Sequence, residues 1–254
     1  MPPSSAPTIS VEDLTLAFGS FVVMRDLTFD VEQGEIFVIM GGSGSGKSTL
    51  LKHLIGLLRP SEGTVRLEGR PLWDMDEDER AAQLRRTGVL YQKGALWSSM
   101  TLAENVALPF QEHTELGPTD IDRLVSLKLA LVGLRGFEAF RPHEISGGMR
   151  KRAALARAIA LDPRVLFVDE PTSGLDPVSA RRLDDLLLQL RDSLDTTVVV
   201  VSHNLESIFT IADRALYLDI ETKTMTALGP PAALREDPPN PRVHQFLTRS
   251  LEAA

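Results

Sequence analysis

The stretch GGSGSGKS at residues 41–48 constrains the fold more than any other part of this 254-residue chain. It fits the pattern G-x-x-x-x-G-K-[ST], with Gly41, Gly46, Lys47 and Ser48 at the fixed positions. The apolar run EIFVIM precedes it, and the helical pattern STLLKHLIGLL follows it. A flexible Gly/Ser linker would not lie between a buried strand and an apolar helix. The pattern therefore predicts a strand, a glycine-rich loop and a helix in direct succession.

This loop is suited to bind phosphate. Glycines let the backbone curl until successive N–H groups point inward, and the start of the helix adds partial positive charge. Lys47 can reach the β- and γ-phosphates of a nucleoside triphosphate, and the Ser48 hydroxyl can bind Mg²⁺. The residues assigned to this phosphate site are Gly41, Gly42, Ser43, Gly44, Ser45, Gly46, Lys47, Ser48 and Thr49.

Strand and helix patterns alternate through the rest of the chain. Residues 9–35 alternate apolar and polar positions around a Gly-Ser turn, which indicates an antiparallel β region. Strands are predicted at 35–40, 63–72, 89–92, 164–170, 196–202 and 214–228, and helices at 48–58, 76–88, 147–161, 178–194 and 204–213. Residues 101–140 are predicted to be mainly helical. The expected fold is α/β, a P-loop NTPase core whose mostly parallel sheet has helices on both faces, with an inserted helical subdomain.

Composition narrows the class of protein. The net charge of −8 argues against a general nucleic-acid-binding surface, so no nucleic acid is expected as a partner. The absence of cysteine excludes a disulfide framework and a thiolate metal site. No stretch approaches the roughly 20 apolar residues that span a bilayer, so any membrane-spanning part must come from another chain.

Three segments are expected along the chain. Residues 1–8 lack the pattern of a secretory signal and are predicted to be a disordered leader. Residues 9–235 form the main domain, with the helical subdomain at about 95–160. Residues 236–254 are a C-terminal extension that begins proline-rich and then becomes amphipathic, and a frayed terminal helix is one interpretation of it. The apolar positions of that pattern are Val243, Phe246, Leu247 and Leu251.

Two carboxylates follow the apolar strand RVLFV. Asp169 and Glu170 would lie where a parallel strand leaves the sheet, which is the ligand-binding edge of such folds. Asp169 can hold Mg²⁺ through water, and Glu170 can polarise the water that attacks a γ-phosphate. A kinase would instead need an acceptor pocket, which the sequence does not reveal. A small GTPase would need an N-K-x-D motif, which is absent.

A second anion-binding pattern occurs about a hundred residues after the first, in HEISGGMRKR at residues 143–152. Ser146, Gly147 and Gly148 begin a helix, so they offer N–H groups and a hydroxyl to an anion. In isolation, the segment is equally typical of an ordinary helix cap.

Taken together, the loop, the acid pair and ISGGM resemble the ATPase subunits of ABC transporters over roughly residues 9–230. The resemblance implies that ATP and Mg²⁺ are bound between two subunits. The phosphate loop of one subunit would bind ATP, and the Ser146–Gly148 segment of the other would close over the γ-phosphate. It therefore implies a head-to-tail homodimer with two sites.

The same resemblance assigns roles to single residues. Gln92 would contact Mg²⁺ or the attacking water, His203 would contact the γ-phosphate, and Asp176 would lie at the dimer seam. Phe18 would stack on adenine, for which an aromatic face suffices, although a core position is the alternative. A surface glutamine is the alternative for Gln92. The usual LSGGQ motif has Met149 in place of its glutamine here, which puts rate and nucleotide preference in doubt.

Finer features resemble the MlaF type, the ATPases of Mla/Mce phospholipid transport systems. These features are SGGM, residues 91–116, KLALVGLRG and NPRVHQFL. The resemblance implies a homodimer on the cytoplasmic face of a bacterial inner membrane. Its implied partners are a MlaE-type permease, an MCE-domain MlaD-type protein, a MlaB-type STAS protein and the phospholipid cargo. In this family the C-terminal extension reaches across the neighbouring subunit.

The segment after Gln92 is apolar for a surface, and two interpretations stay open for it. It can be subdomain core, or part of a groove for an amphipathic helix of the permease. Its apolar residues are Ala95, Leu96, Trp97 and Met100. A soluble ABC ATPase of iron–sulfur assembly, without a permease, remains an alternative function. A chromosome-associated ATPase is excluded because no long heptad pattern is present.

Overall fold

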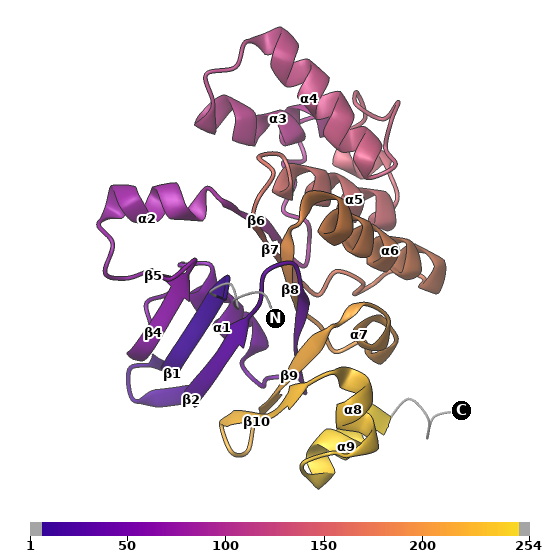
Figure 1. Cartoon of the computed structure of the whole chain (residues 1–254). Helices are drawn as coiled ribbons and strands as arrows, with labels where there is room; N and C mark the ends of the chain where they lie inside the picture. The colour runs from indigo at the N-terminus through magenta and orange to yellow at the C-terminus, as the bar shows by residue number, and fades with distance from the viewer. Residues whose placement is uncertain (1–6, 249–254) are drawn as a thin grey trace, which may run out of the picture.

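The computed structural model describes residues 7–248, and two β-sheets occupy the centre and the left of the molecule (Figure 1). The first sheet is antiparallel, in the order β2-β1-β4-β5. Its strands are β1 (Ile9–Phe18), β2 (Phe21–Val31), β4 (Glu62–Leu67) and β5 (Arg70–Pro71). The leader predicted for residues 1–8 lies outside the described residues except at its end. There Thr8 is buried, and its carbonyl oxygen accepts a hydrogen bond from the Glu68 N–H.

The second sheet has six strands in the order β10-β9-β3-β8-β7-β6. Every neighbouring pair is parallel except β9 and β10, which confirms the predicted fold class. The strands are β3 (Ile36–Gly41), β6 (Thr87–Leu90), β7 (Val165–Asp169), β8 (Thr197–Val201), β9 (Arg214–Asp219) and β10 (Thr224–Gly229). The central strands are buried on both faces, as their continuous apolar sequences require.

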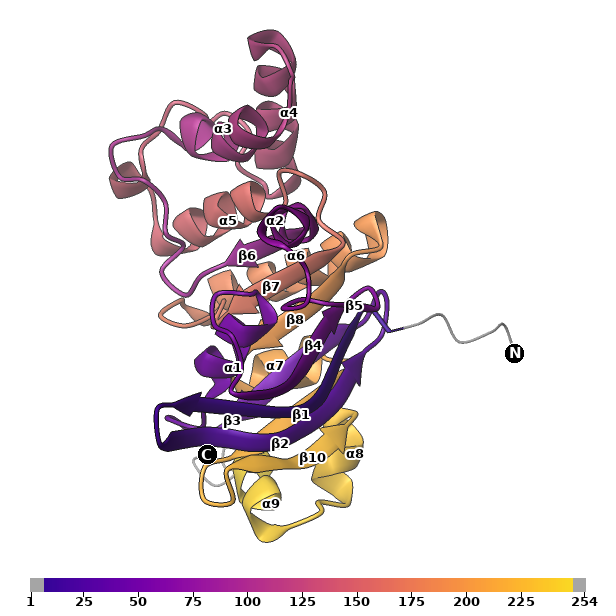
Figure 2. The ribbon, with the colours of Figure 1, turned by 90° about the vertical axis from the view of Figure 1, so that its left-hand side faces the viewer.

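The two faces of this sheet are covered by different structures. One face packs against α5 (Gly147–Ala158), α6 (Pro177–Leu194) and α7 (Leu205–Ile211). The other packs against α1 (Lys47–Leu54) and the antiparallel sheet, and the ring of Phe29 stacks on that of Phe37 at 5.5 Å. Figure 2 shows β1, β2 and β4 lying across this second face. The expectation of helices on both faces is therefore only half right, because strands supply most of the second cover.

The helical subdomain lies at the end of the molecule opposite the C-terminal helices (Figures 1 and 2). It contains α3 (Leu102–His113) and α4 (Pro118–Leu131), which pack on α5, and a short turn, η1 (Pro142–Glu144), leads into α5. Thr101 and Glu104 form a reciprocal capping box that fixes the start of α3. Residues 101–140 are mainly helical, as predicted, but residues 132–140 are not. α4 ends at Leu131, and Gly133, whose φ is +68°, lies just beyond its C-cap residue Val132.

The predicted helix 76–88 is shorter in the structure, where α2 spans Glu77–Leu84. Gly88 belongs to β6, so the strand begins before the predicted 89–92 and ends before Gln92. A Cβ atom on Gly88 would lie 2.2 Å from the carbonyl oxygen of Ala158. This glycine therefore permits close packing of β6 against α5 and does not end a helix. Other element boundaries differ from prediction by a few residues, most at α1, which ends at Leu54 and not at 58.

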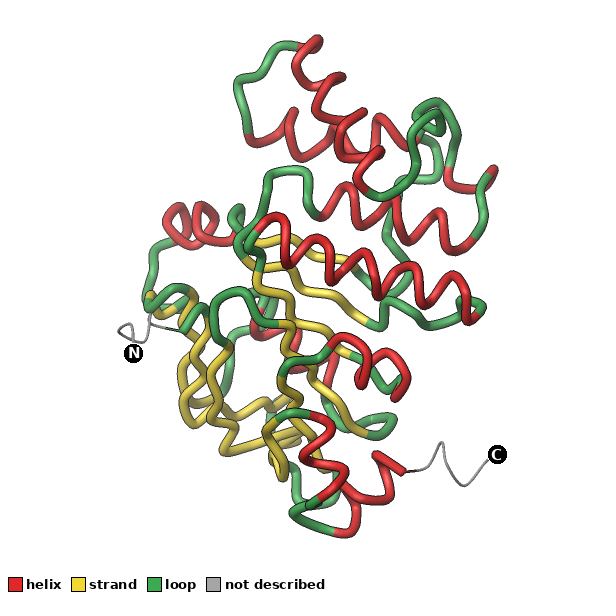
Figure 3. Tube along the Cα trace, turned by 45° about the vertical axis from the view of Figure 1, so that its right-hand side comes forward, coloured by secondary structure: helices red, strands yellow, loops and turns green. Residues whose placement is uncertain are grey.

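The described residues end in two short helices, α8 (Pro231–Glu236) and α9 (Pro241–Thr248), beside β9 and β10 (Figure 3). Val243, Phe246 and Leu247 are buried, and the Phe246 ring meets the Tyr217 ring edge-on at 5.2 Å. The predicted amphipathic pattern is therefore packed on its own chain, and a frayed helix is the wrong interpretation of residues 241–248. Leu251 lies outside the described residues. Within residues 7–248, no helix has the length and apolar character that a membrane crossing needs.

Candidate nucleotide site

The glycine-rich loop joins β3 directly to α1, as predicted. Gly44 and Gly46 have φ values of +76° and +83°, a region that glycine enters at little cost. A Cβ atom on Gly41 would lie 2.7 Å from the Leu218 carbonyl oxygen and 2.6 Å from the Ser45 hydroxyl. Gly46 is the N-cap of α1, and no side chain caps the helix there. The loop therefore presents its own N–H groups at the start of α1, which is the arrangement that binds anions.

Lys47 lies over this loop and is only 8% exposed. Its Nζ donates to the carbonyl oxygens of Gly41 at 3.0 Å and Gly42 at 2.7 Å. Of the next two residues of α1, Ser48 is exposed and Thr49 is half-buried. A bound phosphate would therefore meet a charged ammonium already held against the loop, and only a short movement would transfer its hydrogen bonds.

Asp169 ends β7 beside this loop. One of its carboxylate oxygens, Oδ1, is buried without a hydrogen-bond partner in the described structure. Burial raises the pKa of Asp169, as does the neighbouring Glu170, whereas Lys47, Lys52 and a hydrogen bond from Ser48 lower it. An unsatisfied buried carboxylate oxygen near a serine hydroxyl fits the oxygen ligands of Mg²⁺. No cluster of three or more His, Cys, Asp or Glu that could hold a metal occurs in residues 7–248.

Glu170 and His203 come together at the edge of neighbouring strands. Asp169 of β7 pairs with Val201 of β8, which places the following residues of both strands side by side. The His203 Nδ1 and Glu170 Oε1 atoms are 2.7 Å apart, and with the carboxylate charged the ring N–H donates. Glu170 is only 8% exposed, whereas the His203 side chain is 55% exposed. A buried carboxylate oriented by an accessible imidazole is a reasonable general base.

The Ser146–Gly148 segment has different surroundings. The Ser146 hydroxyl caps α5 by accepting the Met149 N–H at 3.2 Å. A Cβ atom on Gly148 would lie 3.2 Å from the Ser179 side chain of α6, so this glycine allows the two helices to approach. The segment begins α5, which packs on one face of the six-stranded sheet, whereas the loop at 41–48 leads into α1 on the other face. One chain therefore does not bring its two anion-binding patterns together.

The remaining predicted residues are all exposed. Gln92 is exposed, two residues beyond β6. Asp176 caps α6 by accepting the Ser179 N–H at 2.9 Å, and hydrogen bonds from Ser179 lower the pKa of Asp176. Phe18 is 55% exposed at the end of β1, so the core alternative for it is wrong.

Sequence reasoning missed the residues beside Phe18. Phe21 pairs with Phe18 across the β1–β2 turn and is 63% exposed. Lys223 places its ammonium 5.1 Å from the centre of the Phe21 ring, and its carbonyl oxygen accepts the Arg25 N–H. The position of Phe21, just after a Gly-Ser turn, was the only local signal, because the β9–β10 turn arrives from a distant part of the chain.

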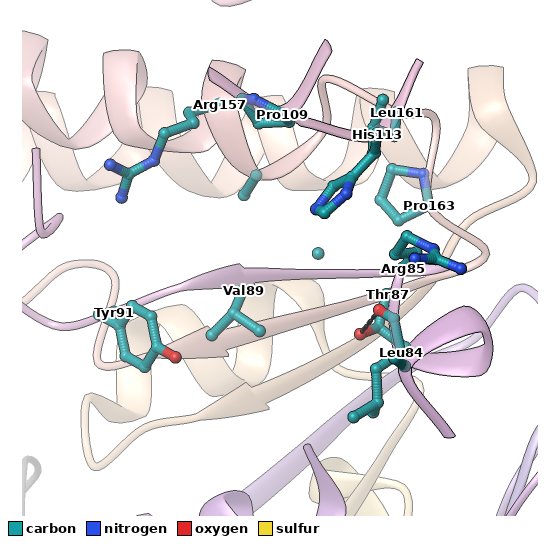
Figure 4. Close-up of a pocket in the computed structure, with 13 residues that line it drawn as sticks. Leu84, Arg85, Thr87, Val89, Tyr91, Pro109, His113, Arg157, Leu161 and Pro163 are labelled. Atoms are coloured by element: carbon teal, nitrogen blue, oxygen red, sulfur yellow. Dashed lines mark hydrogen bonds between the residues drawn. The ribbon is translucent and has the colours of Figure 1, made fainter. Parts of the chain in front are cut away.

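A cavity of about 480 Å³ lies between β6, α2, α3 and α5. Figure 4 shows Pro109 and His113 of α3 across the cavity from Val89 and Tyr91. None of the four residues predicted around 95–100 lines this cavity, so a permease groove at those residues stays a prediction. Leu96 packs on the core instead, and Trp97 is exposed beyond the cavity.

Comparison with known proteins gives this geometry its context. The ABC transporter family model matches residues 24–173, more than half of the chain. The chain belongs to the ABC transporter family. It is accordingly an ABC-type ATPase that binds and hydrolyses ATP. A dimeric structure of the cassette MJ0796 bound to ADP and Pi is 28% identical, with a TM-score of 0.79, and the match covers 87% of this chain and 98% of that one.

Two groups of relatives are similar over most of the chain. The intermembrane phospholipid transport system ATP-binding protein MlaF of Escherichia coli K12 is 39% identical over 97% of this chain and 91% of its own length. The probable ribonucleotide transport ATP-binding protein mkl of Mycobacterium leprae is 43% identical over 94% of this chain. This chain spans about two thirds of the mkl protein's length, 68%. The resemblance to MlaF-type ATPases is thereby confirmed.

Proposed function

We propose that this ABC ATPase drives phospholipid movement between two membranes, working as a homodimer beneath a permease. The observation that carries the proposal is the match to MlaF, which extends over nearly the full length of both chains. The match to mkl also covers most of this chain but leaves about a third of that protein unmatched, since 68% of it is covered. Transport of ribonucleotide, which the name of mkl indicates, is therefore the second candidate for the cargo.

The arrangement of the site supports a shared pocket. The loop, Asp169, Glu170 and His203 form one half within a single chain, whereas Ser146–Gly148 lie apart at the start of α5. A second copy, placed head to tail, would bring its α5 start over the γ-phosphate held by the first. When bound, Mg²⁺ would neutralise charge on the β- and γ-phosphates, with Ser48, Asp169 and Gln92 as its protein contacts. Glu170, oriented by His203, would accept a proton from the attacking water.

The cavity beside β6 is the proposed place for the permease. Its walls come from both the sheet and the helical subdomain, so an inserted helix would contact both. Arg157 lines the cavity and also donates to the carbonyl oxygens of Ala95 at 2.9 Å and Gly94 at 3.0 Å. These bonds fasten the loop that carries Gln92 to α5. A permease helix that pressed on this wall would therefore also move the Gln92 loop.

The other partners follow from the same proposal. A MlaE-type permease would hold the ATPase at the cytoplasmic face of a bacterial inner membrane. A MlaD-type protein with an MCE domain would bind through the permease, and a MlaB-type STAS protein would bind the ATPase itself. The crossing of the C-terminal extension, residues 236–254, to the neighbouring subunit is also part of the proposal, although the apolar face of α9 within it packs on its own chain.

Recovery of the complex from detergent-solubilised membranes, followed by lipid analysis, tests the proposal. We expect a membrane protein and phospholipid to co-purify with the wild-type chain. Ala81→Trp would fill the cavity from an exposed position of α2 and should abolish this recovery while ATP binding persists. Ala82→Trp is the matched control, since Ala82 is exposed on the same helix but does not line the cavity. Recovery of no membrane protein with the wild-type chain would favour the soluble assembly ATPase, and co-purified ribonucleotide in place of lipid would favour the second cargo.

A further inference from the structure

A buried cation of α5 lies directly behind the acid pair. Lys151 is only 8% exposed, although lysine is rarely buried unless it is paired. Its Nζ donates to the main-chain carbonyl oxygen of Glu170 at 3.0 Å. Burial lowers the pKa of Lys151, and the charges of Glu170 and Asp169 oppose that shift. The chain therefore keeps a desolvated ammonium beside both carboxylates.

The bond from Lys151 holds an unusual backbone conformation. Glu170 has a φ of +47°, in the left-handed region that residues other than glycine seldom adopt. Its N–H donates to the Val201 carbonyl oxygen, and its own carbonyl oxygen accepts from Ser173 N–H and from Lys151. These bonds orient the main chain so that the carboxylate meets His203. Because Lys151 belongs to α5, the position of α5 affects the orientation of Glu170.

The same helix begins with the Ser146–Gly148 segment. Gly147 and Lys151 are four residues apart, so they lie on one face of α5, a single turn from each other. A displacement of the first turn therefore moves the Lys151 ammonium by a similar amount, since a helix transmits axial movement over one turn. From there it reaches the main chain of Glu170.

We propose that Lys151 is a positioning residue that couples the two nucleotide sites of the dimer. It ties the helix start that closes over the partner's nucleotide to the Glu170 of its own subunit. Contact with the nucleotide at one site thus affects the orientation of the Glu170 carboxylate at the other site. The coupling rests on the proposed function, because it needs a pocket shared between two copies, whereas the bond from Lys151 to Glu170 lies within one chain.

Lys151→Met is the first test, because it removes the ammonium and keeps an unbranched side chain. We expect kcat to fall about 10-fold or more while KM and the affinity for a fluorescent ATP analogue change by less than about threefold. Lys151→Arg keeps a donor and should recover part of kcat. Arg152→Met is the matched control, since Arg152 also donates from α5 to main-chain oxygens, those of Val132 and Gly133, away from the site. It should leave kcat unchanged.

Hydrogen exchange of the nucleotide-free protein provides a readout that does not depend on activity. Lys151→Met should speed exchange in residues 168–175, which contain the Glu170 N–H, and Arg152→Met should not. Equal effects of the two variants on exchange and on kcat would assign Lys151 a merely structural role and overturn the proposal.

Mixed dimers separate action within a subunit from action across the interface. With Lys151→Met and Glu170→Gln in the same subunit, the other subunit keeps an intact pair, and we expect activity close to that of the wild-type/Glu170→Gln dimer. With the two changes in different subunits, neither subunit keeps an intact pair, and activity should fall about 10-fold or more below that of the wild-type/Glu170→Gln dimer. If Lys151 instead serves only the helix start for the partner's site, the two results would be reversed. If the wild-type/Glu170→Gln dimer is itself inactive, the role of Lys151 is decided by the kcat values and the hydrogen-exchange rates of Lys151→Met and Arg152→Met.

The two proposals fail separately. If the Lys151→Met variant forms dimers with ATP and keeps the wild-type kcat, the proposed role of Lys151 is wrong and the proposed function still stands. An active wild-type monomer would overturn the shared pocket, and the effect of Lys151 on Glu170 would then be confined to a single site.

Discussion

The two anion-binding segments of this chain differ in how complete they are. The loop at 41–48 is enclosed by its own chain, with Lys47 buried against it and Leu218 closing on Gly41. The Ser146–Gly148 segment contacts its own helix and α6, and Ser146 is exposed. The difference supports our proposal that one chain builds a binding half that is complete by itself and a closing half that needs a second copy.

Lys47→Ala should have the largest effect, because it damages the enclosed half directly. Loss of the ammonium that lies against the loop should nearly abolish ATP binding and turnover. Affinity for a fluorescent ATP analogue and the ATPase rate of the assembled complex are the measurements. Lys52→Ala, an exposed change on the same helix, should cost far less. Unchanged ATPase activity in Lys47→Ala would contradict the assignment of the loop.

Glu170→Gln should separate binding from chemistry within the enclosed half. The substitution keeps the size of the side chain but removes the charge that attracts a proton from water. We expect ATP binding to persist and the hydrolysis rate to fall by about 10²-fold or more. Single-turnover hydrolysis with radiolabelled ATP measures this step. A rate near that of the wild-type protein would show that Glu170 is not the base.

A smaller effect is expected at Asp184, on the helix α6 that supports the closing half. Burial raises the pKa of Asp184 to about 6, and its carboxylate accepts the Ser207 hydroxyl at 2.6 Å. The folded state therefore keeps this proton to a higher pH than the unfolded state. The stability that the protonated form provides is present below about pH 4 and is lost as the pH rises through about 6.

Asp184→Asn removes the buried charge and keeps an acceptor for Ser207. Near neutral pH, we expect it to raise the free energy of unfolding by on the order of 1 kcal/mol, a gain that should shrink as the pH approaches 4. Thermal unfolding at several pH values measures this. Asp185→Asn is the control, because Asp185 is exposed and pairs with Arg181. A gain that is equal at all pH values would show that titration of Asp184 is not its cause.

The sequence predicted the parts of the site that depend on local order. The loop between β3 and α1, the acid pair at the end of β7 and the helix that begins at Gly147 are each adjacent in the chain, so the pattern of a few residues defines them. The mostly parallel sheet also followed from the alternation of strand and helix patterns.

Features that depend on distant contacts were beyond this reasoning. The sequence predicts that Gly88 ends a helix, whereas the structure shows that the Ala158 carbonyl oxygen packs against it. In the sequence, Lys151 is one of several neighbouring basic residues, and only the structure shows its Nζ bound to the Glu170 carbonyl oxygen. The cavity beside β6 was not predicted, because its walls come from four elements whose relative positions no local pattern defines. Tertiary packing decides these points.

ATPase activity of mixed dimers that carry Lys47→Ala and Gly147→Asp tests the shared pocket most directly. With one change in each subunit, both would fall in the same composite site, and the second site would stay intact and active. With both changes in one subunit, each site would lose one half, and activity should vanish. Equal activity of the two arrangements would contradict a pocket shared between two copies of this chain.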